Sequence, residues 1–99
     1  MKLRWKRLWV KALRSGKFRQ GHHQLRQGNA FCCLGVLCKV VKPHVEWNDM
    51  DEFQGEELMP PAHLLKDIGL SLRSAKSLAK MNDDGKTFEQ IAKRIEAKY

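Results

Sequence analysis

A run of eleven residues near the middle of the chain, "FCCLGVLCKVV" at residues 31–41, most constrains the fold, because Lys39 is its only charged residue. A chain of 99 residues has room for one modest hydrophobic core, and a segment this apolar belongs in it. Its length fits either a buried strand or a buried helix. We expect a buried central helix, in which Gly35 permits close approach of a neighbouring element and which Pro43 prevents from extending further.

Residues 3–14 predict an amphipathic helix, because their apolar members recur at the spacing of one helical face. These members are Trp5, Leu8, Trp9, Ala12 and Leu13. Basic residues occupy the other face, and Ser15-Gly16 ends the helix. Such a helix can lie on a membrane surface, but we expect the tryptophan stripe to form part of the core that a small domain needs.

Residues 17–30 show no helical period and are interrupted by Gly21 and Gly28, with "QGN" as a turn signal. We expect two short extended segments there, roughly 17–20 and 24–27, paired as a small hairpin. After the central helix comes a long polar connection that contains an acidic loop.

The C-terminal part, residues 60–99, is predicted to be helical. Helices are expected over 61–68 and 71–81, "NDDGK" predicts a turn, and Thr87 with Gln90 fits a capping box that starts a last helix. The apolar stripe of that helix is Phe88, Ile91, Ala92 and Ile95. The predicted fold is therefore mainly α, of the α+β class. It is a single domain of four to five helices, with a short β-hairpin or extended segment between the first helix and the buried central helix.

Charge is distributed very unevenly along the chain. Residues 1–45 contain eleven Lys or Arg and no Asp or Glu, whereas the acidic loop, residues 46–57, holds six of the eleven acidic residues. The net charge is +8. This distribution favours an anionic partner, which can be a nucleic acid, a nucleotide or an acidic protein surface. The alternative is a solvated face without a partner.

Three cysteines draw attention to residues 32–38, but their spacing argues against chemistry. Cys32 and Cys33 are adjacent, so they diverge on a helix and do not form the paired units that zinc prefers. A catalytic thiol needs a neighbouring base, and nothing in the sequence requires His22 or His23 to meet a cysteine. We expect buried structural thiols. We expect no catalytic residue, no metal and no cofactor.

A basic loop is the stronger candidate for a binding site. Arginine can grip phosphate with two hydrogen bonds, backbone N–H groups beside glycine can add donors, and phenylalanine can offer a stacking face. No phosphate-binding glycine loop or dinucleotide fingerprint accompanies it. The candidate ligand-binding residues are Arg14, Lys17, Phe18, Arg19, Gln20, His22 and Arg26, with Lys11 beside them.

No apolar run approaches the ~20 residues that span a bilayer. The N-terminus lacks the apolar core and cleavage site of a signal peptide. We therefore expect a cytosolic protein.

Three blocks of sequence together resemble a known family. They are "LRSGKFRQG" at 13–21, "FCCLGVLC" at 31–38 and "LAKMNDDGKTFEQIAKRIE" at 78–96, the last preceded by "MPPAHLLKDIGL". The chain resembles a family of small bacteriophage-encoded proteins. The resemblance implies a phage accessory protein in the cytoplasm of the bacterial host, where small phage proteins often counter host defence.

Two binding functions follow from this resemblance and the basic loop. In the first, the protein sequesters an anionic nucleotide, such as a cyclic nucleotide that serves as a host immune signal, without catalysis and as a monomer or homo-oligomer. In the second, its positive face binds nucleic acid or inhibits a host defence nuclease. An enzyme is the third and least expected alternative.

Overall fold

The apolar run forms the central helix, α2 (Cys33–Val41), of the computed structural model, which describes residues 1–99. Residues 33–38 of this helix are all buried, which confirms the expected central helix. Cys32 is its N-cap, and the sulfur of Cys32 accepts a hydrogen bond from the Gly35 N–H at 3.4 Å. Phe31 lies outside the helix, in a short strand, because the chain is extended up to Cys32.

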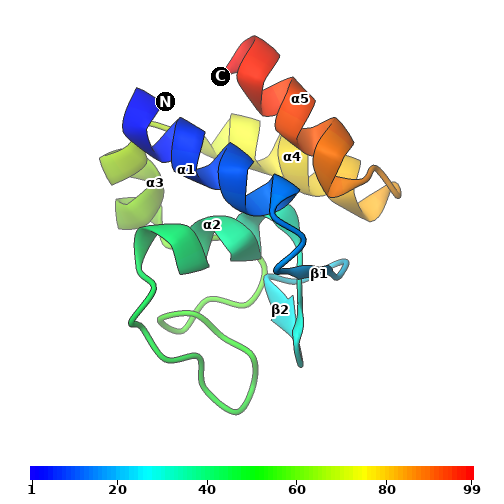
Figure 1. Ribbon diagram of the computed structural model, residues 1–99. Helices are drawn as coiled ribbons and strands as arrows, with labels where there is room; N and C mark the ends of the chain where they lie inside the picture. The colour runs from blue at the N-terminus through cyan, green and yellow to red at the C-terminus, as the bar shows by residue number, and fades with distance from the viewer.

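Helix α1 (Leu3–Arg14) packs against α2 on one side and against α5 (Phe88–Lys98) on the other (Figure 1). Trp9 and Leu13 are buried, and the Trp9 indole N–H donates to the Cys33 carbonyl oxygen at 2.9 Å. The tryptophan stripe is thus core at Trp9, as expected. Leu8 of the predicted stripe, however, is 40% exposed, whereas Val10 outside that stripe is buried. The buried surface of α1 differs from the predicted stripe because α1 packs against two helices, α2 and α5.

The three strands are β1 (Arg19–Gln20), β2 (Arg26–Gln27) and β3 (Ala30–Phe31). They form a sheet in the order β1-β3-β2, in which β1 is parallel to β3 and β2 is antiparallel to it. The predicted pairing of 17–20 with 24–27 is therefore wrong. The turn at Gly28, with φ 62°, returns the chain so that β3 lies between the other two strands.

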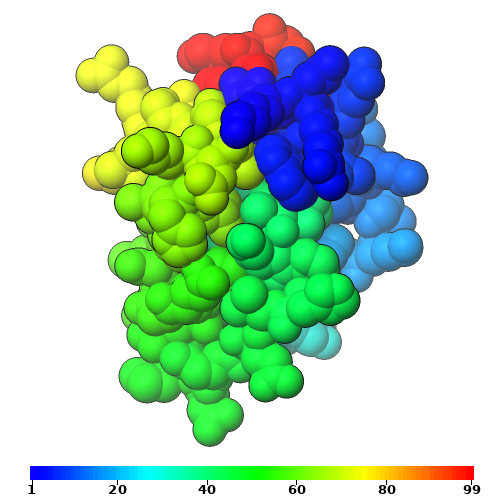
Figure 2. Space-filling view, turned by 90° about the vertical axis from the view of Figure 1, so that its left-hand side faces the viewer, coloured from blue at the N-terminus to red at the C-terminus, as the bar shows by residue number.

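Residues 42–61 connect α2 to α3 (Ala62–Ile68) and contain no helix and only one isolated β-bridge, between Phe53 and Glu56. This segment includes the acidic loop and forms the end of the molecule opposite α5 (Figure 2). Phe53 is completely buried and anchors the segment to the core.

Helix α4 (Leu72–Asp83) follows α3 and runs two residues further than predicted, so the "NDDGK" turn begins only at Asp84. The predicted capping box is present at the start of α5. All four residues of its predicted stripe are buried. Five helices and one small three-stranded sheet confirm the expected α+β fold of a single small domain. None of the helices has the length and apolar character required to cross a bilayer.

Candidate anion-binding surface

The residues of the expected basic loop are distributed over three different elements. Arg14 ends α1, Arg19 and Gln20 form β1, and Arg26 begins β2. Lys17 and Phe18 lie between α1 and β1, and His22 is exposed between β1 and β2. No pocket of the molecule collects them all.

Arg26 and Gln20 make contacts within the protein. The Arg26 Nε lies 3.2 Å from an Asp51 carboxylate oxygen, and its guanidinium lies over the Trp47 ring. The Gln20 side-chain amide donates to the Asn82 Oδ1 at 3.0 Å and to the Lys86 carbonyl oxygen at 2.8 Å. These two side chains therefore hold the loop in place.

Arg14 is bound to two carboxylates of α5, with 2.9 Å to Glu89 and 2.8 Å to Glu96. The hydrogen bond with Glu96, and then that with Glu89, raises the pKa of Arg14, and the same contact with Arg14 lowers the pKa of Glu96. The sequence offers these arginines no nearby acidic residue, since residues 1–45 contain none, but the fold places carboxylates against Arg14 and Arg26. The opposing acids come from α5 and the acidic loop, which are distant in the sequence.

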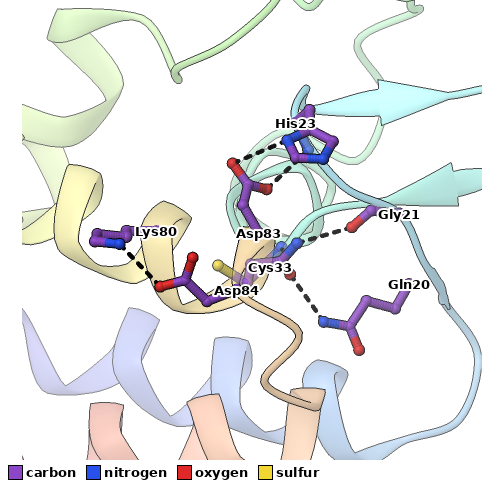
Figure 3. Close-up of polar contacts among 8 residues, drawn as sticks. Gln20, Gly21, His23, Cys33, Lys80, Asp83 and Asp84 are labelled. Carbon is purple, nitrogen blue, oxygen red and sulfur yellow. Dashed lines mark hydrogen bonds and ion pairs between the residues drawn. The ribbon is translucent and has the colours of Figure 1, made fainter.

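Asn82 organises the base of the loop, and sequence reasoning missed it; Figure 3 labels its partners Gln20, Gly21 and Cys33. This side chain is completely buried. Its Nδ2 donates to the Gly21 carbonyl oxygen at 2.8 Å, and its Oδ1 accepts from the Cys33 N–H at 3.1 Å as well as from Gln20. Asn82 follows Leu78 by four residues, so it lies on the buried stripe of α4, which was the available signal.

His23 is held beside Asp83, as Figure 3 also shows. The His23 backbone N–H donates to one Asp83 oxygen at 2.8 Å, and the His23 Nδ1 lies 3.6 Å from the other. The His23 side chain is 77% exposed. No group of three or more His, Cys, Asp or Glu side chains is arranged to hold a metal ion.

The three cysteines are buried free thiols, as expected. Burial raises the pKa of Cys32 to about 11 and also raises the pKa values of Cys33 and Cys38. A thiolate nucleophile requires the opposite shift. In the unfolded chain the thiols lose their protons above a pKa of about 8.5, whereas in the folded protein they stay protonated to higher pH. Deprotonation therefore favours the unfolded chain, and the free energy of unfolding should fall as the pH rises past about 8.5.

We expect the three thiols to be protected from a soluble disulfide reagent. In the folded protein at pH 8, Cys32, Cys33 and Cys38 should react at least ~100-fold more slowly than in the guanidinium-unfolded protein, where all three should react. The measurement is the rate of colour release from the reagent with and without guanidinium. Fast labelling of any one thiol in the folded protein would contradict the buried arrangement.

A basic groove lies along α1 on the side that faces α5. Its lining includes Lys6, Arg7, Lys11 and Arg14, together with Leu3 and Val10 of the same helix, and its only acidic residue is Glu96. Its volume is about 410 Å³. Sequence reasoning included Lys11 and Arg14 but not Lys6 or Arg7, although their spacing along α1 already placed all four near one face.

A second hollow lies on the other side of Lys11 and is more apolar. Its lining consists of Leu8, Lys11, Ala12, Ser15, Lys17, Phe18 and Val40. Its volume is about 390 Å³, and no acidic residue lines it. We refer to these two features as the basic groove and the Phe18 hollow. Lys11 belongs to both, so they form one continuous surface.

Almost all residues that line the basic groove and the Phe18 hollow lie in a range of the chain that matches a known protein family. Residues 1–67 match a family described as a domain of unknown function, DUF8296. This range contains α1, the sheet and α2, and therefore every lining residue of both features except Glu96. No curated protein and no solved structure matches the chain. Since the match covers more than half of the sequence, the chain belongs to the DUF8296 family.

Proposed function

We propose that the protein binds nucleic acid without catalysis, through phosphates that lie in the basic groove of α1. The observation that carries this proposal is the lining of the groove, in which four cationic side chains face a single carboxylate. Glu96 and Glu89 engage Arg14, so Lys6, Arg7 and Lys11 remain as the cations without an ion-pair partner. Arg7 and Lys11 are exposed, and Lys6 is half-buried.

The cations follow the length of the helix rather than surrounding one point. From Lys6 to Lys11, the range of the cations without an ion-pair partner, the helix rises about 7.5 Å. A row of this length suits successive phosphates of a strand, and the release of their condensed counterions favours binding. Arg7 can also bind a phosphate through two parallel hydrogen bonds. An extended polyanion fits this row better than one small anion does.

Sequestration of a small nucleotide is the second candidate, and the Phe18 hollow favours it. The hollow combines an aromatic side chain with Lys11 and Lys17 and lacks acidic residues. A mononucleotide would use Phe18 and these two lysines but not Lys6 or Arg7. The two candidates therefore differ in whether the far end of the basic groove contributes to affinity.

The setting that we propose is the cytoplasm of a phage-infected bacterium. The three sequence blocks that resemble small bacteriophage-encoded proteins support it, and one of them, residues 13–21, supplies Ser15, Lys17 and Phe18 to the Phe18 hollow. In that setting, a protein that coats nucleic acid can shield it from a host defence nuclease.

The combined change Lys6→Gln, Arg7→Gln and Lys11→Gln tests the groove. We expect affinity for fluorescein-labelled single-stranded DNA to fall about 10- to 100-fold at 50 mM salt, because three phosphate contacts are lost. The slope of log affinity against log salt concentration should also become shallower by about 2. Fluorescence anisotropy over a series of salt concentrations measures both quantities.

A matched variant removes the same charge elsewhere. Lys66→Gln, Arg73→Gln and Lys76→Gln change three cations of α3 and α4, none of which lines the groove or the Phe18 hollow. This variant should bind at close to the wild-type affinity. If both variants lose the same affinity, binding depends only on net charge and the proposed groove is wrong.

A further inference from the structure

We infer that the nucleic acid is single-stranded and that one unpaired base enters the Phe18 hollow while its phosphates lie in the basic groove. This inference rests on the proposed function. It starts from the position of Lys11, which lines both features and so lies between them. A nucleotide has the same two parts, an anionic phosphate and a flat aromatic base, joined over a short distance.

The hollow has the composition of a site for a flat, mainly apolar group. Leu8, Ala12 and Val40 supply aliphatic walls, and Phe18 supplies a ring. Its volume of about 390 Å³ lies in the range of small-molecule pockets. The cations of the hollow, Lys11 and Lys17, are both exposed at its rim. Apolar walls below a cationic rim match a base that carries a phosphate.

The ring of Phe18 is held in place from behind. It meets Phe31 edge to face, with ring centroids 5.5 Å apart and an interplanar angle of 87°. Phe31 meets Trp47 in the same way at 5.7 Å, and Trp47 lies 5.2 Å from the buried Phe53. This row of aromatic rings connects the hollow to the core. A ring that is already fixed loses little conformational entropy when a base stacks on it.

The backbone before Phe18 is fixed as well. The Ser15 hydroxyl donates to the Ala12 carbonyl oxygen at 2.7 Å and accepts from the Lys17 N–H at 3.1 Å. Gly16 takes φ 76° between them, which turns the chain from α1 toward β1. The turn thus places Lys17 and Phe18 on the same hollow as Leu8 and Lys11.

A duplex cannot use this hollow, because its bases are paired and stacked inside the helix. It can contact only the basic groove, through its phosphates. A single strand can use both features, and a base can stack on an aromatic ring whatever its identity. The inference therefore predicts a preference for single strands with little dependence on sequence.

A strand without bases tests this directly on the wild-type protein. Three fluorescein-labelled probes are compared: oligothymidylate, an abasic strand of the same length and charge, and a duplex of the same length. We expect the oligothymidylate to bind about tenfold more tightly than the abasic strand, because only it can stack on Phe18. Equal affinity for these two probes would overturn the inference.

Two variants of Phe18 then identify the stacking residue. Phe18→Leu should lower the affinity for oligothymidylate to that for the abasic strand and leave the abasic strand unaffected, whereas Phe18→Tyr should retain the wild-type preference. Circular dichroism checks that each variant is folded, and if Phe18→Leu does not fold, the abasic comparison and Phe18→Tyr decide. Full retention of affinity by folded Phe18→Leu would overturn the inference.

The test separates this inference from the proposed function. If bases add nothing but the Lys6, Arg7 and Lys11 variant still loses affinity, the groove stands and the inference fails. If that variant binds every probe as the wild type does, the proposed function fails. Equal affinity for thymidine monophosphate and oligothymidylate would favour the small-nucleotide candidate and overturn the single-strand inference.

Discussion

Gly35→Ala is expected to destabilise the protein by at least about 3 kcal/mol, although alanine is the better helix former by about 1 kcal/mol. A Cβ atom on Gly35 would overlap the carbonyl oxygen of Leu25 and lie 2.8 Å from its carbonyl carbon. The obstacle is backbone, so no side-chain rotation can relieve it. Urea unfolding followed by tryptophan fluorescence measures the change.

The chain at Leu25 has little freedom to move away from Gly35. The Leu25 N–H donates to the Glu57 carbonyl oxygen at 2.8 Å, and its carbonyl oxygen accepts from the Cys32 N–H at 3.2 Å. The Leu25 side chain is completely buried. A shift that accommodates a methyl group at position 35 would therefore break these hydrogen bonds or open the core.

Gly28→Ala is the matched control for the loss of a glycine. Gly28 has φ 62°, and a Cβ added there meets nothing within 4 Å. Only backbone strain remains, and it should cost about 1–2 kcal/mol. Equal destabilisation by Gly35→Ala and Gly28→Ala would contradict the conclusion that the Leu25 backbone leaves no room for a Cβ atom at position 35.

Elements with local signals could be predicted from the sequence. The capping box at Thr87, the apolar stripe of α5 and the apolar run of α2 each lie within a dozen residues, so their helices were identified. The strands could not be paired, because each consists of two residues and offers no alternation to read. The sheet is held instead by the turn at Gly28 and by contacts of the loop with α4.

In the candidate site, too, local features could be predicted from the sequence and long-range contacts could not. The excess of positive charge in the N-terminal half was visible, but the groove requires α5 to lie against α1, which no local pattern reveals. The partners of Arg14 come from residues 75 and 82 positions further along the chain. The sequence therefore indicated the basic character of the candidate site, whereas the fold determines which of its cations have no ion-pair partner.

Asn82→Ala is the second change with a large expected effect. It should lower the free energy of unfolding by about 3 kcal/mol, because the Cys33 N–H and the Gly21 carbonyl oxygen would both be left buried without a partner. The Cys33 N–H lies in the first turn of α2, where backbone N–H groups have no acceptor within their own helix. Asn82 thus caps α2 from α4, and urea unfolding measures the loss.

Two further variants separate hydrogen bonding from packing at this site. Asn82→Leu fills the space but cannot bond, so it should be about as destabilising as Asn82→Ala; recovery with leucine would mean that a cavity is responsible. Asn48→Ala removes an asparagine that also accepts two backbone N–H bonds, from Met50 and Glu52, but on the surface. Because water can replace those bonds, this change should cost about 1 kcal/mol or less. A comparable loss at both asparagines would contradict the role of Asn82 as the buried link between the loop, α2 and α4.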